Sequence, residues 1–247
     1  MLGSMTTILR QLRLSGLAST LEVRLQEATA NRLSHQEFLG LLLQDELTVR
    51  KNRLIARRLK TGGFKEQKTL DEFDWTFNSG IKNREIFELS TGKFIQDAQD
   101  VLFIGPPGVG KTHLAQAIGQ QAIRLGYTAL YRSIFDITRE FLQNETMMGE
   151  DKVMTSYLKT DLLIIDDMGM RQLPKHSGEF LLEVIERRHE NRSTIMTSNR
   201  PIEEWGKFIG DVPVTTAILD RFLQNAQIIT LSGRSYRLRN KAGKKGE

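Results

Sequence analysis

Residues 101–121 read VLFIGPPGVGKTHLAQAIGQQ, and this stretch decides the fold. Its first four residues, Val101 to Ile104, form an apolar run that is typical of a strand buried on both faces of a sheet. The next eight, Gly105 to Thr112, match the phosphate-loop pattern G-x-x-x-x-G-K-[ST]. Apolar residues then recur at spacings of three and four, which predicts a helix. A strand, a phosphate loop and a helix in this order predict an α/β protein that binds a nucleoside triphosphate.

Each residue type in the loop has a physical role. The glycines at 105, 108 and 110 let consecutive N–H groups point into one concavity, and the positive end of the following helix adds to this anion site. Lys111 is expected to reach the β- and γ-phosphates, and the Thr112 hydroxyl to ligate Mg²⁺. We therefore expect ATP and Mg²⁺ as cofactors. The candidate ATP-binding residues of the loop are Gly105, Pro106, Pro107, Gly108, Val109, Gly110, Lys111, Thr112 and His113.

A second motif lies about fifty residues further along the chain. The apolar residues 162–165 predict another buried strand, and Asp166 and Asp167 follow it directly. Asp166, at the strand end, is predicted to hold the magnesium. Asp167 is predicted to orient and polarise the attacking water. An acidic pair after a strand is a weak signal alone, but its combination with a phosphate loop is a strong one.

A third polar strand end follows in the stretch STIMTSNRP, residues 193–201. Ligands of open parallel sheets lie beyond the carboxyl ends of the strands, so Asn199 is a candidate for orienting the same water or contacting the γ-phosphate. The alternative is that Asn199 is an ordinary turn former before Arg200 and Pro201.

The first sixty residues read as helices with leucine at helical spacing, and residues 34–37 form a capping-box pattern. The helix that follows this box ends in a basic run, in which positions 50, 53, 57 and 60 share one face. Such a face can follow DNA phosphates without reading sequence. The candidate DNA-binding residues are Arg50, Lys51, Arg53, Arg57, Arg58 and Lys60.

Gly62 and Gly63 predict the end of this helix and a linker. We therefore expect a small all-helical domain over residues 1–62, used for DNA binding and assembly. Residues 63–247 would form the nucleotide-binding domain with a basic tail. Within the linker, the aromatic residues 73, 75 and 77 favour anchoring on the core, and packing beside an adenine ring is the alternative.

Charge is unevenly distributed along the 247 residues, whose formal net charge is +5. Residues 1–65 hold 11 Lys and Arg against 5 Asp and Glu, and residues 221–247 hold 7 against 1. The middle of the chain holds 17 against 24. Two basic ends around an acidic centre predict a polyanionic partner distinct from the nucleotide. Solvated helix faces and a disordered tail are the alternative explanation.

The composition also excludes several classes of protein. The sequence has no cysteine, which excludes disulfides and thiolate metal sites and agrees with a cytoplasmic location. No apolar run approaches the roughly 20 residues that span a bilayer, and no signal peptide is readable. We expect a cytoplasmic protein without membrane partners, associated with the nucleoid when it is bound to DNA.

These motifs resemble a known family. The phosphate loop GPPGVGKTHLA, the acidic LLIIDDMG, the strand end TIMTSNRP and AILDRF at 217–222 are similar to AAA+ ATPases of the clade of DnaA-like initiators and DnaC-like helicase loaders. The leucine-rich N-terminal helices, LDEFDW and the C-terminal SGRSYRLR resemble IstB, the ATP-binding helper of bacterial insertion sequences. The resemblance covers nearly the whole chain.

The resemblance implies an AAA+ fold with five parallel strands, at 101–104, 128–131, 162–166, 194–197 and 227–231. It also implies a homo-oligomer with ATP held between subunits, in which Arg221 acts as the arginine finger supplied in trans. Arg187 and Arg188 are rival candidates for the finger. Arg237 matches a sensor-2 arginine that contacts the nucleotide.

The chain departs from the AAA+ pattern at two points. Asp167 stands where most of these enzymes have glutamate, which suggests slow or partner-dependent hydrolysis. Few residues follow the last expected strand, so the helical lid domain is absent or vestigial. This puts the role of Arg237 in doubt and leaves the basic tail as a phosphate-binding alternative.

The resemblance to IstB implies that the protein binds duplex DNA with little sequence preference in an ATP-dependent assembly. In that role it would help the transposase of the same element to select its target and insert. Two alternatives stay open: a DnaC-like helicase loader, and a switch that binds ATP without hydrolysing it usefully.

Overall fold

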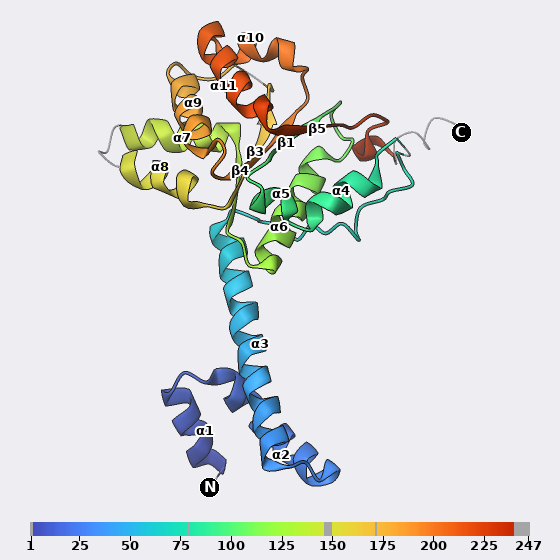
Figure 1. Ribbon diagram of the computed structural model, residues 1–247, viewed down its shortest axis with the longest axis vertical. Coiled ribbons are helices and arrows are strands. Elements are labelled where there is room, and N and C mark those ends of the chain that lie inside the picture. Colours follow the sequence, from blue (N-terminus) through green and yellow to red (C-terminus); the bar gives the residue numbers. More distant parts are fainter. Residues whose placement is uncertain (1, 79, 146–149, 171, 240–247) are drawn as a thin grey trace. The chain divides into compact units, whose positions relative to one another are not determined.

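The computed structural model describes residues 2–78, 80–145, 150–170 and 172–239 (Figure 1). The chain divides into two compact units, residues 1–57 and residues 58–247. The long helix α3, His35–Thr61, extends past the division and ends just before Gly62, the expected end of the N-terminal domain. No helix in the described part of the chain is both long and apolar enough to cross a bilayer.

The N-terminal unit consists of α1, Leu2–Gln11, α2, Ser15–Asn31, and the greater part of α3. The predicted capping box is present, since Ser34 N donates to Glu37 Oε2 (2.8 Å) and Glu37 N donates to Ser34 Oγ (3.3 Å). The buried carboxylate of Glu46 accepts from Gly16 N (2.6 Å) and Leu17 N (3.1 Å), and so satisfies the free N–H groups at the start of α2. The core of this unit is small, with Leu17, Leu21 and Leu42 as its buried members.

The second unit is built on a sheet of five parallel strands in the order β2-β3-β4-β1-β5, which confirms the fold predicted from the sequence. The buried strands are those whose residues form near-continuous apolar runs, as expected for a sheet that is covered on both faces. The strands are β1, Asp100–Ile104, β2, Ala129–Ser133, β3, Leu162–Met168, β4, Ser193–Ser198, and β5, Ala226–Thr230.

Helices cover both faces of this sheet (Figure 1). Side chains of β1, β3 and β4 that point to one face form a core with Ile134, Phe180, Trp205 and Phe222. On the other face, α6 contacts β1 to β4, and α4 contacts α6. The helices are α4, Asn83–Ser90, α5, Lys93–Gln96, α6, Lys111–Leu125, α7, Ile134–Glu145, α8, Glu150–Lys159, α9, Ser177–Arg188, α10, Trp205–Ile209, and α11, Val212–Gln224.

Two features of the second unit concern its short elements. Residues 83–96 contain the short helices α4 and α5, which are separated because the chain turns at Gly92, whose φ is +78°. After β5, the described residues contain a single 3-10 turn, η2, Tyr236–Leu238. The other 3-10 turn, η1, Ile202–Glu204, precedes α10.

Candidate functional site

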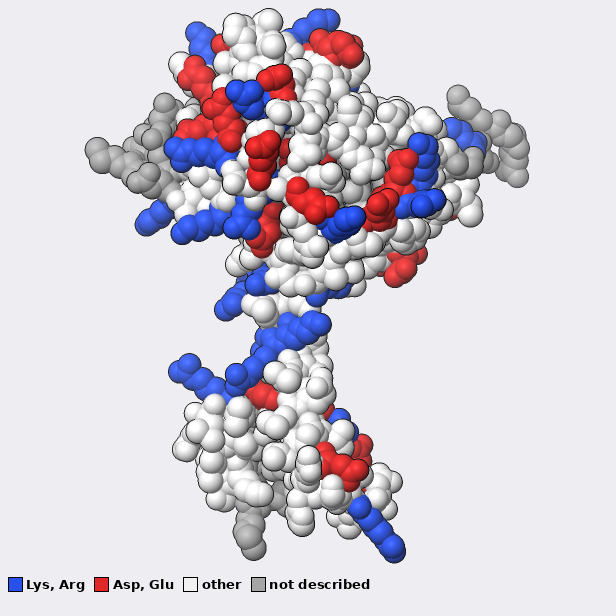
Figure 2. Space-filling view, viewed as in Figure 1, with Lys and Arg blue, Asp and Glu red and all other residues white. Residues whose placement is uncertain are grey.

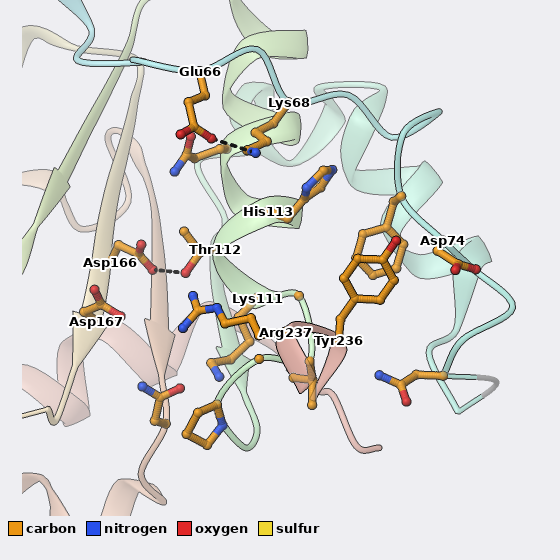
Figure 3. A pocket seen from close by; sticks show the side chains of 18 of the residues that line it. Glu66, Lys68, Asp74, Lys111, Thr112, His113, Asp166, Asp167, Tyr236 and Arg237 are labelled. Carbon is orange, nitrogen blue, oxygen red and sulfur yellow. Dashed lines mark hydrogen bonds and ion pairs between the residues drawn. The ribbon is translucent and has the colours of Figure 1, made fainter. Parts of the chain in front are cut away.

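A pocket of about 580 Å³ lies in the second unit, at the carboxyl ends of the strands (Figure 3). Its walls come from the phosphate loop and the start of α6, from the ends of β3 and β4, and from two segments that lie far apart in the sequence. These two segments are residues 66–78, before α4, and the turn η2. The fold thus gathers one pocket from both ends of the second unit.

The phosphate loop closes around its own lysine. Lys111 Nζ donates to the carbonyls of Gly105 (2.7 Å) and Pro106 (2.9 Å). These two residues therefore contact the lysine, but they do not line the pocket. Burial lowers the pKa of Lys111 to about 8. At Gly108, where φ is +83°, an added Cβ would lie 2.1 Å from Ser235 Oγ, so this position has no room for a side chain. Pro107, Gly108, Val109, Gly110, Lys111, Thr112 and His113 all line the pocket.

Asp166 is the most connected acid of the site. Its side chain is almost fully buried, and it accepts hydrogen bonds from Thr112 Oγ1 (3.0 Å), Tyr131 Oη (2.6 Å) and Thr197 Oγ1. Burial and the charge of Asp166 raise the pKa of Tyr131, so its phenol stays protonated and donates. Tyr131 was not predicted from the sequence, because nothing in its strand pattern distinguishes it from a core residue.

Asp167 has an uncommon backbone conformation, with φ of +64°. Its N–H donates to Thr197 Oγ1 (3.2 Å) rather than to a regular strand partner, and the β3–β4 register shifts at this point. Burial and the charge of Asp166 raise the pKa of this half-buried carboxyl, while Arg237 and Lys111 lower it. Left-handed residues of this kind cluster at functional sites, which agrees with the role predicted for Asp167.

Three further predicted residues lie in the pocket. Asn199 lines it from the end of β4, and Arg237 lines it from η2, next to Lys111 and Asp167 (Figure 3). His113 also lines it, and its Nε2 lies 2.9 Å from the carbonyl of Thr69. The short C-terminal segment raised a doubt about whether Arg237 can contact the nucleotide. The position of Arg237 in the pocket does not support that doubt.

The three candidate finger arginines lie outside the pocket lining. Arg221 is exposed on α11 and pairs with Asp220 (2.9 Å), and Arg187 is exposed on α9 and pairs with Glu183 (2.8 Å). Arg188 is 1% exposed and donates to the carbonyls of Tyr157 (2.6 Å) and Ser193. The prediction of Arg188 as a rival finger was therefore wrong, because no neighbouring subunit can reach its buried guanidinium.

The aromatic residues of the linker are divided between the two roles considered for them. Phe73 and Phe77 line the pocket, and the Phe77 ring meets Tyr236 edge to face with centroids 5.1 Å apart. Trp75 packs against Phe87 (5.3 Å) and is absent from the lining. Part of the linker therefore belongs to the site itself.

The candidate DNA-binding residues lie along the C-terminal half of α3, where Figure 2 shows Lys and Arg side chains gathered. Arg50 pairs with Glu46 (2.7 Å), and Arg53 contacts Ser15 Oγ. Arg58 is directed elsewhere, since its guanidinium donates to the carbonyls of Gly126 and Tyr127 (3.1 Å). Lys51, Arg57 and Lys60 are exposed.

The oxygen atoms of Thr112 and Asp166 suit magnesium. Mg²⁺ prefers hard oxygen ligands, uses one or two protein side chains and keeps several waters. The two side chains already lie within hydrogen-bond distance of each other, so one small cation can contact both. Among the described residues, no group of three or more His, Cys, Asp or Glu side chains forms another metal site.

Comparisons with known proteins agree with this geometry. The family described as "IstB-like ATP binding protein" matches residues 7–244. The ATP-binding protein of insertion sequence IS5376 from Geobacillus stearothermophilus is 37% identical over 231 residues, 94% of this chain and 92% of that protein. The corresponding protein of insertion sequence IS21 from Pseudomonas aeruginosa is 34% identical over 236 residues, 95% of this chain and 88% of that one.

Solved structures share the fold at lower identity. AMPPCP-bound DnaA from Aquifex aeolicus has a TM-score of 0.57 at 21% identity, covering 74% of this chain and 56% of DnaA. The chain thus spans about half the length of that protein. The DnaC helicase loader has a TM-score of 0.51 at 22% identity, covering 64% of this chain and 97% of DnaC. These likenesses show that the second unit shares its fold with DnaA and DnaC.

Proposed function

This chain belongs to the family of IstB-like ATP-binding proteins, and from that premise we propose that it is an ATP-dependent DNA-binding protein of an insertion sequence. Family membership confirms the resemblance noted in the sequence. In the proposed role the chain binds ATP and Mg²⁺ and oligomerises on duplex DNA without sequence preference. There it assists the transposase of the same element in target selection and insertion.

One observation carries the catalytic part of this proposal. The pocket brings together Lys111, Thr112, Asp166, Asp167 and Asn199, which come from three separate stretches of sequence. A phosphate cradle, a pair of oxygen ligands and a second carboxylate are the parts that ATP hydrolysis requires. The pocket also has aromatic walls in Phe73 and Phe77, which a nucleobase can contact.

Each side chain has a distinct task in hydrolysis. Lys111 would exchange the carbonyls of Gly105 and Pro106 for the outer phosphates, which keep its ammonium charged. Thr112 and Asp166 would hold magnesium, which when bound neutralises charge on the phosphates. Asp167 and Asn199 would orient the attacking water, with Asp167 polarising it. Because Asp167 is shorter than glutamate, we expect slow hydrolysis that DNA or a partner stimulates.

Assembly would complete the site. Arg221 is exposed and lies outside its own chain's pocket, so its guanidinium is available to a neighbouring subunit. An arginine supplied in trans stabilises the charge that develops on the transferred phosphoryl group. ATP bound between subunits would then link hydrolysis to the oligomeric state.

The exposed basic face of α3 is the proposed DNA contact. Phosphate contacts of Lys and Arg bind DNA without reading its sequence, and an oligomer repeats the same contacts along the duplex. The names of the relatives place them in insertion sequences, a context that implies a transposase as partner.

Phosphate release tests this function directly. We expect the wild-type protein to hydrolyse ATP slowly and to speed up when duplex DNA is added. Lys111→Ala protein should stay at background in both conditions, because it lacks the phosphate-binding ammonium. Wild-type release that equals the Lys111→Ala background with DNA and transposase present would favour the switch that does not hydrolyse ATP.

The second candidate, a DnaC-like helicase loader, rests on the shared fold alone. It predicts a complex with a replicative helicase and a preference for single-stranded DNA. The insertion-sequence names of relatives that match nearly the whole chain favour the transposition role.

A further inference from the structure

The segment after β5 passes next to the phosphate loop and is bonded both to the end of β1 and to the loop. Leu231 N donates to the carbonyl of Ile104 (2.7 Å), and Tyr236 N donates to the carbonyl of Gly108 (2.9 Å). The residues between these bonds have no regular secondary structure. Arg237 therefore reaches the pocket from a short segment that no lid domain supports among the described residues.

Asn78 supplies a third attachment of this segment. Its side chain is buried, and its amide makes two hydrogen bonds to the backbone of a single residue, Arg234. Asn78 Nδ2 donates to the Arg234 carbonyl (3.0 Å), and Arg234 N donates to Asn78 Oδ1 (2.9 Å). A side-chain amide that pairs with both backbone polar groups of one residue fixes the position and the direction of the backbone at that residue.

The surroundings of this pair leave little freedom. Gly233 has φ of +128°, and an added Cβ would lie 2.3 Å from Asn78 Oδ1, so the two residues are in close contact. Next to them, the guanidinium of Arg234 lies 5.5 Å from the centre of the Phe77 ring, which also meets Tyr236. The linker before α4 and the C-terminal segment are thus packed together beside the site.

Arg237 follows three residues after Arg234 and points to the part of the pocket that holds Lys111 and Asp167 (Figure 3). That part would receive the outer phosphates, because Lys111 and the magnesium ligands lie there. If Arg237 is held at that end of the pocket, its guanidinium can contact the γ-phosphate, which ADP lacks, and so favour the binding of ATP. Arg237 lies in the three-residue turn η2, so its position depends on the contacts of the segment that leads to this turn.

We propose that Asn78 is a positioning residue, which aims Arg237 at the γ-phosphate by clamping the backbone of Arg234. This inference rests on the proposed function, because it takes ATP as the ligand of the pocket.

Equilibrium binding of ATP and ADP to single and double variants of the full chain tests the clamp. Arg237→Ala should weaken ATP binding about 10- to 100-fold, as expected for a lost charged hydrogen bond, and change ADP binding less than about twofold. Asn78→Ala should weaken ATP binding about tenfold with the same selectivity. In the Arg237→Ala background, Asn78→Ala should have almost no further effect, because the two residues act in series.

A second variant reaches the clamp without altering Asn78. Gly233→Ala should displace the amide and reproduce the selective loss of ATP affinity. Gly126→Ala is its matched control, since Gly126 also has positive φ (+107°) but no atom within 4 Å of an added Cβ. Asn225→Ala is the control for Asn78→Ala, because it removes an asparagine bond to the Ala98 carbonyl (3.2 Å) outside the pocket.

The outcomes separate this inference from the proposed function. If Lys111→Ala abolishes ATP binding while Asn78→Ala leaves the preference for ATP over ADP intact, the clamp is wrong and the ATP site stands. Equal losses for ATP and ADP, or additive effects of Asn78→Ala and Arg237→Ala, would also overturn the clamp. If Lys111→Ala binds ATP as tightly as the wild type, the ATP site fails, and the clamp fails with it.

Discussion

Arg187 and Arg188 are adjacent on α9, yet they have opposite surroundings. Arg187 is exposed, whereas the guanidinium of Arg188 donates to carbonyls that flank the starts of β3 and β4, including that of Thr160 (2.9 Å). Burial lowers the pKa of Arg188 to about 10, and the charge of Asp100 opposes that shift. A charge at this depth is tolerated only with its donors satisfied. Arg188 therefore holds the sheet to the helices.

Substitution should separate these two arginines. Arg188→Ala should lower the free energy of unfolding by about 3–5 kcal/mol, because it leaves the buried carbonyls of Tyr157, Thr160 and Ser193 without their donor. Arg187→Ala should change it by less than about 0.5 kcal/mol, since an exposed ion pair contributes little. Urea denaturation of both variants checks this. Similar small changes in the two would contradict the structural role of Arg188.

The buried lysine of the phosphate loop gives a prediction about pH. Burial lowers the pKa of Lys111 to about 8 in the free protein, and bound phosphates favour the charged form and raise this pKa again. Above about pH 8 a large share of the lysine is neutral before binding and charged after it. ATP binding at pH 8.5 should therefore take up a proton, whereas at pH 7 the lysine is already charged.

Calorimetry in two buffers of different ionisation enthalpy measures this proton uptake. Lys111→Arg protein is the control, because a guanidinium stays charged at both pH values. Wild-type binding with the same proton count at pH 7 and pH 8.5 would show that the lysine is not neutralised by burial.

At the scale of elements, the sequence predicted the strands and the phosphate-binding helix well. Their signals are local: apolar runs of strand length, and a loop whose glycines and lysine have fixed spacing. The contacts of Tyr131 with Asp166, and of Asn78 with Arg234, could not be predicted, because each joins residues that are distant in sequence. The site's composition is thus readable from motifs, but the residues that position it are not.

Helix α11 leads to a prediction about catalysis between subunits. Arg221→Ala should leave ATP affinity unchanged and lower turnover about a thousandfold, as for other arginines supplied in trans. Mixing it with Asp167→Asn protein should restore part of the activity, because some interfaces then contain both intact residues. Steady-state phosphate release from each protein and from the mixture measures this. A mixture that is no more active than its components would place the finger elsewhere.

Helix α3 leads to a prediction about DNA. With about 100° between successive residues, positions 53, 57 and 60 share one side of the helix, and Lys51 lies on the opposite side. Changing Arg53, Arg57 and Lys60 together to Gln should weaken duplex binding. It should also reduce the slope of log K against log salt by up to about 0.9 per lost phosphate contact.

Lys51→Gln is the matched control for this triple change. It removes the same kind of charge from the same helix, so it should change the slope much less. Arg50 is left intact, because it pairs with Glu46, whose carboxylate caps α2. A slope that the triple change leaves unaltered would assign the basic face to contacts with protein.

At the scale of the whole molecule, the chain combines a nucleotide-binding unit with a small helical unit that carries basic residues. In the proposed function neither part would need to bind DNA tightly by itself, because an oligomer would join many weak phosphate contacts on one duplex. If ATP is held between subunits, the binding of ATP and the assembly of the oligomer become a single equilibrium. ATP would then control DNA binding through assembly.

The most direct test of this account is the binding of a random duplex of some tens of base pairs with ATP, with ADP and without nucleotide, using single-stranded DNA as competitor. Assembly size should be measured in the same samples. We predict that the protein binds the duplex tightly only when ATP is present, and that this binding is accompanied by a large increase in assembly size. Single-stranded DNA should compete weakly. Binding that is independent of nucleotide, or that prefers the single strand, would contradict the account and favour the helicase loader.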